Sequence, residues 1–421
     1  MATTTQSVSE ICIAAREASR QLAQTAASVK SAALELIADA LVARTDEILD
    51  ANGLDLTAAD DQGLSSALID RLRLDHDRVA AIAASTRRIA ALSDPVGEVV
   101  DGYRLPNGLE MRKIRVPLGV VAVIYESRPN VTIDSAALCL KSGNAVVLRG
   151  SSAAANSNAI LAGIASEAAT AAGLPEHSIS LVAGGGHEEL TALATQSGLI
   201  DLIIPRGGEG LKRALKGVAS VPVIFAASGN CHVYVDSSAD LEAAERIIIN
   251  AKVQRPGVCN AAETLLVHRA VAAEFLPRAL AALLEAGVVV HADALTRALV
   301  PELQLLEASN EDWEREYLAL ELAVKVVEST DDAVAHINRY GSGHSEAIIT
   351  AQTSSARAFQ LGVDAACVYV NASTRFTDGA EFGMGAEIGI STQKLHARGP
   401  IGLRDLCTTK YLVEGTGQSR P

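Results

Sequence analysis

The sequence predicts an α/β protein with two doubly wound parallel-sheet domains and a small antiparallel β element. Three observations lead to this prediction. Short apolar runs alternate with helix-length segments from 120 to 225, and a second alternation of this kind runs from about 240 to 370. Between Asp94 and Pro117 the pattern changes to short alternating runs with turn residues, which is typical of an antiparallel hairpin. A length of 421 residues suits two large domains or three smaller ones.

The elements follow in chain order. Residues 7–50 are expected to form two amphipathic helices, because Ser7 and Glu10 have capping-box spacing and small apolar residues recur at helical intervals. The first sheet is expected to have strands at 120–124, 145–148, 179–182, 202–204 and 223–225, with helices near 132–141, 156–172, 187–196 and 208–216. The second is expected to have strands near 264–267, 288–290, 323–327, 347–350 and 366–370. The tail from 399 is predicted to be an extended arm that returns to the hairpin.

Composition excludes several classes of function. The 36 basic and 50 acidic side chains leave a net charge of −14, so no bulk positive field attracts nucleic acid or anionic lipid. The longest uncharged stretch, 217–235, contains Pro222 and Gly229, which suits a buried strand and turn rather than a membrane span. Glu10 and Arg16 interrupt the N-terminal segment, so no secretion signal is expected. We therefore expect a soluble protein with neither nucleic acid nor membrane as partner.

The six cysteines contain no C-x-x-C pair, and no histidine lies at metal-ligand spacing. We therefore expect no metal site, no disulfide framework and a reducing, cytoplasmic compartment. The strongest candidate for chemistry is Cys259, which follows a Pro256-Gly257 turn and precedes Asn260 and a strand. A thiol in such a turn is accessible to a substrate, and the neighbouring backbone amides can donate to a developing oxyanion. An isolated cysteine is more often a small buried apolar residue, and the other five are interpreted in that way.

Three glycine-containing turns follow predicted strands. They are Arg149-Gly150-Ser151-Ser152, Gly184-Gly185-Gly186 and Arg206-Gly207-Gly208. Backbone N–H groups in such turns can approach phosphate, and the last turn directly precedes a helix whose N-terminus favours anions. Glycines after strands are also ordinary loop residues, and no G-x-G-x-x-G or Walker sequence is present. Both interpretations stay open on the residues alone.

Two other segments carry polar groups. Arg128 could pair with a carboxylate or phosphate, and Asn130 could donate a hydrogen bond near the next helix, although a surface arginine and a helix cap explain the same residues. The segment 336–348 places two histidines and Glu346 in one helix-to-strand loop. A hydrogen-bonded structural histidine is the more frequent case, and no Asp or Ser partner order supports a catalytic triad.

Taken together, these stretches resemble the gamma-glutamyl phosphate reductase family of the aldehyde dehydrogenase superfamily. The resemblance covers nearly the whole chain and rests on segments 116–132, 140–152 and 254–264 and on spaced residues between Val327 and Ile348. It implies an aldehyde-dehydrogenase-like fold and an NADP-dependent glutamate-5-semialdehyde dehydrogenase of proline biosynthesis. Such an enzyme reduces L-glutamyl 5-phosphate with NADPH, through a Cys259 thioester, to L-glutamate 5-semialdehyde and phosphate.

The resemblance also assigns roles to individual positions. Cys259 is the implied nucleophile. The implied cofactor-binding residues are Arg149, Ser151 and Ser152 beside the adenosine ribose, Gly184, Gly207 and Gly208 at the phosphates, and Glu316 at the nicotinamide ribose. The implied substrate-binding residues are Arg128, Asn130, Ser373, Thr374 and Arg375.

This chain departs from the wider superfamily in two motifs. Where oxidising relatives carry a Glu-x-Gly-Gly general base, it has Ala226-Ala227-Ser228-Gly229, so no base that activates water is expected there. Where those relatives have an oxyanion asparagine in a Pro-Trp-Asn motif, it has the Glu-Ser-Arg-Pro-Asn segment at 126–130. Within the reductase family, Ala153 and Ala154 follow where an acidic residue is often expected. Its absence, with Arg149 nearby, favours NADPH over NADH.

The resemblance further implies three structural parts and an oligomer. The expected division is an NADP-binding domain at 1–96 and 117–229, a catalytic cysteine domain at 230–398, and an oligomerisation hairpin and arm at 97–116 and 399–421. A homo-oligomer is expected, and the glutamate kinase that supplies the substrate is a second candidate partner. Two alternatives stay open: another acylating or hydrolytic aldehyde dehydrogenase acting on a small acid semialdehyde, and a catalytically silent scaffold that binds nucleotide. The intact turn around Cys259 argues against the scaffold.

Overall fold

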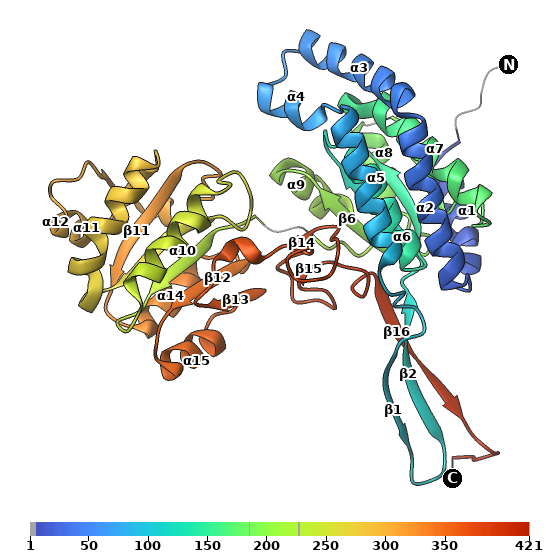
Figure 1. Cartoon of the computed structure of the whole chain (residues 1–421). Coiled ribbons are helices and arrows are strands. Elements are labelled where there is room, and N and C mark those ends of the chain that lie inside the picture. The colour runs from blue at the N-terminus through green and yellow to red at the C-terminus, as the bar shows by residue number, and fades with distance from the viewer. Residues whose placement is uncertain (1–5, 185, 226–227, 421) are drawn as a thin grey trace. The chain divides into compact units, whose positions relative to one another are not determined.

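The protein is described by a computed structural model that covers residues 6–184, 186–225 and 228–420 (Figure 1). The chain forms two compact units. The first contains Met1–Phe225, Met384–Gly389 and Ile401–Pro421, and the second contains Ala226–Gly383 and Ile390–Pro400. This division is coarser than the three-part division expected from the sequence, because the hairpin and the end of the C-terminal arm belong to the first unit. The functional assignment of the three parts stays a prediction.

The first unit is built on a parallel sheet with strand order β5-β4-β3-β6. Its strands are β3 (Val120–Tyr125), β4 (Ala145–Arg149), β5 (Ile179–Leu181) and β6 (Leu202–Arg206). These strands are almost entirely buried, as expected for strands covered on both faces. One face packs on α1 (Val8–Leu22), α8 (His187–Ala194) and α9 (Glu209–Val218). The other carries α6 (Asn130–Lys141) and α7 (Ala155–Ala171), with α2 (Ala27–Ala43) and α5 (His76–Ala91) packed on them.

Two sequence predictions for this unit are wrong. Residues 7–50 contain two helices and the beginning of a third, α3 (Thr45–Asp61), because Arg44 at φ −110° and ψ 25° interrupts the helical backbone. The strand expected at 223–225 is reduced to a single bridge between Ile203 and Val223, next to Pro222, which has no N–H to donate to a ladder. The capping box at Ser7 and Glu10 is confirmed. A short helix, α4 (Ser66–Leu72), follows α3.

The hairpin is confirmed, and the C-terminal arm does return to it. Strand β1 (Val99–Arg104) pairs antiparallel with β2 (Glu110–Pro117), and β16 (Cys407–Glu414) pairs antiparallel with the other edge of β2. The arm therefore joins the hairpin from Cys407 onward. Residues 399–400 instead form β15 (Gly399–Pro400), which pairs with β14 (Ile390–Ser391) in the second unit.

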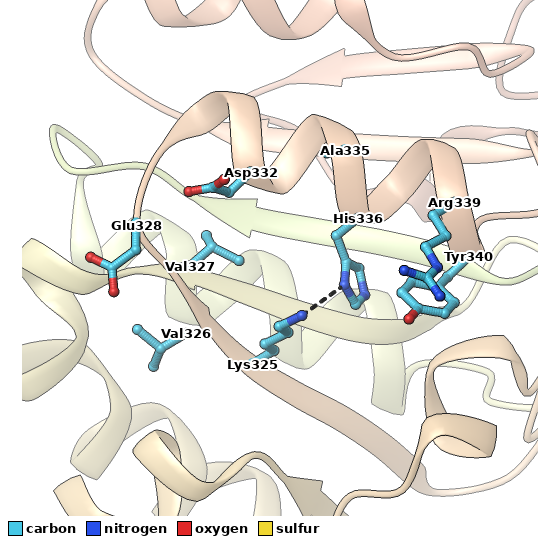
Figure 2. Close-up of a pocket in the computed structure, with 9 residues that line it drawn as sticks. All are labelled: Lys325, Val326, Val327, Glu328, Asp332, Ala335, His336, Arg339 and Tyr340. Atoms are coloured by element: carbon cyan, nitrogen blue, oxygen red, sulfur yellow. Dashed lines mark hydrogen bonds between the residues drawn. The ribbon is translucent and has the colours of Figure 1, made fainter.

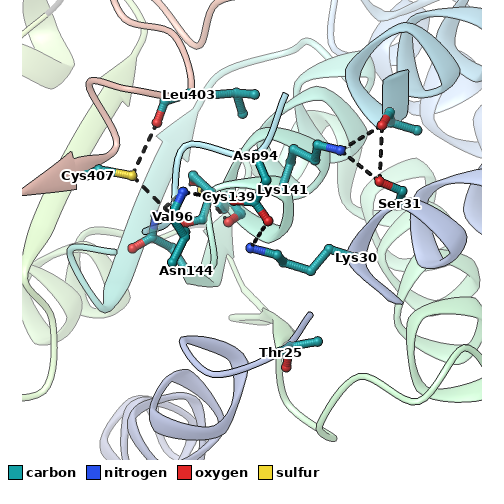
Figure 3. A network of polar contacts seen from close by, with 12 residues as sticks. Thr25, Lys30, Ser31, Asp94, Val96, Cys139, Lys141, Asn144, Leu403 and Cys407 are labelled. Carbon is teal, nitrogen blue, oxygen red and sulfur yellow. Dashed lines mark hydrogen bonds and ion pairs between the residues drawn. The ribbon is translucent and has the colours of Figure 1, made fainter. Parts of the chain in front are cut away.

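A buried polar network fixes the base of this three-stranded sheet (Figure 3). Lys30 forms an ion pair with Asp94, and Lys141 donates to Ser31 Oγ at 2.8 Å and to the Ala90 carbonyl oxygen at 2.7 Å. Burial lowers the pKa of Lys141. The Asn144 amide donates to the Leu406 carbonyl oxygen at 2.8 Å, just before β16 begins. These bonds tie the arm to the first unit.

The second unit contains a seven-stranded parallel sheet with strand order β10-β9-β11-β8-β7-β12-β13. The strands are β7 (Cys231–Val235), β8 (Ala262–His268), β9 (Val289–Ala292), β10 (Leu306–Glu307), β11 (Glu321–Val327), β12 (Ser345–Ile349) and β13 (Cys367–Val370). One face packs on α10 (Leu241–Val253), α11 (Arg269–Glu285) and α12 (Ala294–Leu299), and the other on α14 (Thr330–Tyr340) and α15 (Thr353–Gly362). All five strands predicted for this unit are confirmed.

The remaining short elements are α13 (Asn310–Glu314), η1 (Ser152–Ala154) and η2 (Thr374–Phe376). No helix in the described parts of the chain is both long and apolar enough to span a membrane.

Candidate active site

Cys259 lies in the turn between α10 and β8, at the edge of the second sheet where its strands begin. All six cysteines are free thiols, and Cys259 is partly exposed whereas the other five are buried. Burial raises the pKa of the Cys12 thiol to about 11, and it raises the pKa values of Cys139, Cys231 and Cys407 as well. A nucleophilic thiol has to be accessible and ionisable. Exposure therefore separates Cys259 from the other cysteines, as the sequence predicts.

The backbone of Cys259 is held by Gly229, which lies just before β7. A Cβ on Gly229 would fall on the Cys259 carbonyl oxygen, so no larger residue fits at position 229. The thiol of Cys231 donates to the same carbonyl oxygen at 3.2 Å, and the Gly229 N–H donates to Glu316 Oε1 at 2.6 Å. One glycine thus connects the implied nucleophile with the implied ribose-binding carboxylate.

The loop that follows the edge strand β13 also holds the turn that carries Cys259. The Arg375 guanidinium donates to Asn260 Oδ1, and its Nε donates to Gln254 Oε1 at 2.8 Å. The Asn260 amide donates to the Thr377 carbonyl oxygen at 2.9 Å, and Thr374 Oγ1 donates to the Asn260 carbonyl oxygen at 2.7 Å. These bonds engage both the side chain and the carbonyl oxygen of Asn260 and so hold the turn in place.

Arg375 also supplies positive charge near the sulfur. Burial lowers the pKa of Arg375, and the neighbouring Arg255 lowers it further, whereas negative charge on Cys259 acts in the opposite direction. Of the other predicted substrate residues in this loop, Thr374 is fully buried and Ser373 accepts the Arg375 N–H at 3.3 Å.

Glu316 occupies a loop between α13 and β11 whose backbone is fixed by its neighbours. Tyr317 donates its hydroxyl to Asp312 Oδ1 at 2.9 Å, and the Leu318 N–H donates to Glu263 Oε1 at 3.3 Å. Glu263 in turn pairs with Lys252, with both side chains fully buried and 2.6 Å between Nζ and Oε2. A buried charge pair therefore supports the segment that carries Glu316.

The implied cofactor residues of the first unit gather where its strands end. Arg149 closes β4 and donates to the Gly186 carbonyl oxygen at 2.6 Å. Ser151 Oγ accepts the Ser127 N–H at 3.2 Å, and Ser152 begins η1. Gly184 has φ +100°, a conformation that favours glycine, and Gly185 lies outside the described residues. This edge of a parallel sheet is where doubly wound proteins bind nucleotides.

The turn between β6 and α9 is suited to a phosphate group. The Gly208 N–H, at the N-terminus of α9, donates to a carboxylate oxygen of Glu126 at 2.9 Å. A Cβ on Gly207 would lie 2.8 Å from a Glu126 oxygen, so a larger residue at position 207 would displace the Glu126 side chain. The N-terminus of α9 thus holds the Glu126 carboxylate where the resemblance places the phosphates of the dinucleotide. At Gly150, a Cβ would collide with the Asn158 amide. Glycine at this position therefore lets the backbone after β4 pass close to α7.

The remaining predicted residues are placed as follows. Arg128 is exposed after β3, and Asn130 begins α6 and donates its amide to Asp134 Oδ2 at 3.0 Å. Ala226 lies outside the described residues. Arg128, Asn130 and the glycine turns belong to the first unit, whereas Cys259, Glu316 and 373–375 belong to the second. No group of three or more His, Cys, Asp or Glu side chains in the described parts of the chain could hold a metal ion.

Comparison with known proteins defines the class to which this fold and thiol site belong. Residues 1–297 match the family model of the aldehyde dehydrogenases, and the chain belongs to that family. It is 54% identical over 413 residues to the gamma-glutamyl phosphate reductase of Thermobifida fusca, covering 98% of each chain. It is 55% identical over 406 residues to that of Moorella thermoacetica, covering 96% of this chain and 97% of the other.

A crystal structure of gamma-glutamyl phosphate reductase from Thermotoga maritima superimposes with a TM-score of 0.96 at 45% identity, covering 99% of this chain and 100% of that one. Within the aldehyde dehydrogenases, the chain therefore belongs to the gamma-glutamyl phosphate reductases. The family and the fold class predicted from the sequence are confirmed.

Proposed function

We propose that the protein reduces L-glutamyl 5-phosphate to L-glutamate 5-semialdehyde with a nicotinamide cofactor and releases phosphate, as a step of proline biosynthesis. The observation that carries this proposal is the accessible Cys259 on a turn held by Gly229 and Asn260, in a chain about half identical to reductases of this name. The resemblance assigns the cofactor phosphates to Gly207 and Gly208, at the N-terminus of α9, and the ribose to Glu316.

The chemistry follows from the thiol. The Cys259 thiolate, favoured by Arg375, attacks the acyl carbon, the carbon–oxygen bond to phosphate breaks, and a thioester remains. When bound, the reduced cofactor supplies a hydride to that acyl group. Collapse of the resulting thiohemiacetal breaks the carbon–sulfur bond and releases the aldehyde and Cys259. Backbone amides of the rigid turn provide the oxyanion donors in this proposal, because the Asn260 side chain is already engaged.

The absence of a water-activating base supports reduction over hydrolysis. Position 226 is alanine where oxidising members of the superfamily carry the glutamate base. A thioester that is not attacked by activated water survives until hydride or phosphate reaches it. This favours the reductase over the hydrolytic alternative on a small acid semialdehyde.

The direct assay supplies the labile substrate in situ. Purified protein is mixed with NADPH, L-glutamate, ATP and a separate glutamate kinase, and both NADPH loss and semialdehyde formation are followed. We expect the two to be equal and to require both the kinase and this protein. No oxidation of either NADPH or NADH with active kinase present would overturn the proposed function.

We propose NADPH as the preferred cofactor, held through Arg149. Replacing Arg149 with alanine should reduce kcat/KM for NADPH by roughly ten-fold or more, with a smaller effect on NADH, because a charge-assisted bond to the 2′-phosphate is lost. Arg71→Ala, which removes an exposed arginine on α4, serves as the control. Equal losses with both cofactors would place Arg149 away from the 2′-phosphate.

We propose that the chain forms a homo-oligomer through the β1-β2-β16 sheet. Both outer strands of this sheet have an unpaired edge in the described chain, and the hairpin and arm expose Val99, Tyr103 and Tyr411 by about half. Exposed edges and apolar side chains of this kind favour strand pairing with another copy. Deleting residues 411–421 removes half of β16, and light scattering should then show smaller particles with a lower thermal midpoint. An unchanged size and midpoint would refute the shared sheet.

Two further assignments complete the proposal. Six free cysteines, five of them buried, suit a reducing compartment, which supports the cytoplasm. The glutamate kinase stays a predicted partner, and its physical association can be measured by light scattering of the mixture.

A further inference from the structure

A cavity of about 400 Å³ opens between β11 and α14 in the second unit, and the proposed reaction does not use it (Figure 2). Its lining contains a strand segment and one helix face: Lys325, Val326, Val327, Glu328, Asp332, Ala335, His336, Arg339 and Tyr340. This face includes part of the 336–348 segment, for which no catalytic role is predicted from the sequence.

The charges of the cavity are separated. Figure 2 shows Lys325, His336 and Arg339 grouped at one end, with Glu328 and Asp332 at the other. The two acids are already engaged, because Glu328 pairs with Arg269 at 2.6 Å and Asp332 accepts the Ser329 hydroxyl at 3.0 Å. In the described parts of the chain, no carboxylate lies within ion-pair distance of Lys325 or Arg339. The basic end therefore carries two positive charges that the protein itself does not neutralise.

Aromatic rings support both cations. Lys325 Nζ lies 5.6 Å from the centre of the Trp313 ring, and the Arg339 guanidinium carbon lies 4.9 Å from the centre of the Tyr340 ring. Such contacts hold a cation in place and limit its hydration without cancelling its charge. Lys325 also lies 3.4 Å from His336 Nδ1, which accepts from the ammonium group, so the ring proton is on Nε2.

His336 itself adds no charge. Burial lowers its pKa to about 3, and the nearby His232, Lys325 and Arg339 act in the same direction. Its Nε2 is buried and has no hydrogen-bond partner among the described residues. The basic end thus combines two cations with a neutral donor that lacks an acceptor.

The walls of this end are fixed before any ligand arrives. The buried Asn230 amide donates to the Trp313 carbonyl oxygen at 2.7 Å and to the Tyr340 carbonyl oxygen at 2.8 Å. Trp313 and Tyr340 each pack against the His336 ring, at centroid distances of 5.5 and 4.7 Å. The aromatic side chains that contact Lys325 and Arg339 are therefore in place before an anion binds, which lowers the ordering cost of binding.

We propose that this cavity binds a small dianion, a phosphate or a dicarboxylate, between Lys325 and Arg339. Two negative charges match the two unpaired cations, and the planar guanidinium can donate two parallel bonds to either group. The volume accommodates an ion of this size together with water. The site is independent of the proposed reaction, since none of its lining residues belongs to the catalytic turn.

The protein contains its own reporter. Trp313 is the single tryptophan of the sequence, and it lies against Lys325 and His336. Tryptophan fluorescence is followed while phosphate or succinate is added at constant ionic strength, with chloride as the monovalent control. We expect a saturable change for phosphate, succinate or both, with a dissociation constant on the order of 1 mM, and none for chloride. Phosphate alone or succinate alone would identify which dianion the site prefers.

Variants locate the binding. Arg339→Gln should raise the dissociation constant measured by fluorescence at least ten-fold. Arg357→Gln should leave it unchanged, because Arg357 is an exposed arginine on α15 outside the cavity. Lys325→Gln, which alters the surroundings of Trp313, is tested by calorimetry and should also bind at least ten-fold more weakly. Thermal midpoints verify that each variant is folded. The absence of a saturable response to both dianions, or an equal affinity in Arg339→Gln and the unmodified protein, would overturn the proposal.

Discussion

Replacing Cys259 with serine should lower kcat by about 10⁴-fold or more while leaving cofactor affinity within a few-fold of that of the unmodified protein. An alcohol lacks both the nucleophilicity of a thiolate and its ability to leave from the acyl group. Arg375 cannot compensate, because its charge stabilises a thiolate far more readily than an alkoxide. Turnover and cofactor binding are measured separately, the second by titration without substrate.

The control for this substitution is another cysteine. Cys12→Ala changes a buried thiol in α1 and should retain most of the turnover. If Cys259→Ser keeps substantial reductase activity, the covalent mechanism is wrong.

Breaking the buried Lys252–Glu263 pair should have the largest effect on stability. Lys252→Met leaves a fully buried carboxylate without its cation, and we expect the free energy of unfolding to fall by about 3–5 kcal/mol. Burial already opposes both charges: it raises the pKa of Glu263 to about 7 and lowers the pKa of Lys252. Because Trp313 belongs to the same unit, its fluorescence can follow denaturant unfolding of that unit.

A second substitution tests the cause of this loss. Lys252→Met combined with Glu263→Leu removes both charges and should recover most of the stability lost by Lys252→Met alone, as uncharged replacements of buried pairs often do. The exposed pair between Arg269 and Glu328 provides the control, and Arg269→Met should change stability by less than about 1 kcal/mol. If Lys252→Met lowers the free energy of unfolding by less than about 1 kcal/mol, Glu263 is stable in the protein interior without its lysine partner, and this account of the pair is wrong.

Much of the fold is predictable from the sequence because continuous apolar runs bury both faces of a strand. Most strands of both parallel sheets follow from this pattern, whereas the hairpin follows from short alternating runs with turn residues, and β7 and β10 are absent from the predicted strands. The errors arise where local geometry overrides it. The break at Arg44 leaves no strong sequence signal, and the two-residue β10 is too short for any periodicity. At 223–225 an apolar run suggested a strand, but only one bridge forms next to Pro222.

The candidate site is predictable in part. Cys259 stands out because a turn with proline and glycine precedes it, and that signal is local. The contact between Gly229 and Cys259 joins residues thirty positions apart, and the bonds from Arg375 to Asn260 join residues more than a hundred apart. Nothing in the local sequence marks Glu126 as the acceptor of the Gly208 N–H. Residues that hold the site in place are therefore recognised from the structure, because their role depends on long-range contacts.

The central claim is that Cys259 carries an acyl group that awaits phosphate and is not hydrolysed. The most direct measurement runs the reaction in the oxidative direction, with glutamate semialdehyde and NADP, and counts the NADPH formed per active site without phosphate. The account predicts little more than one equivalent, with an acyl adduct on Cys259 detected by mass spectrometry, and continuous turnover once phosphate or arsenate is added. Sustained NADPH formation and accumulation of glutamate without phosphate would contradict it, because some group would then be activating water.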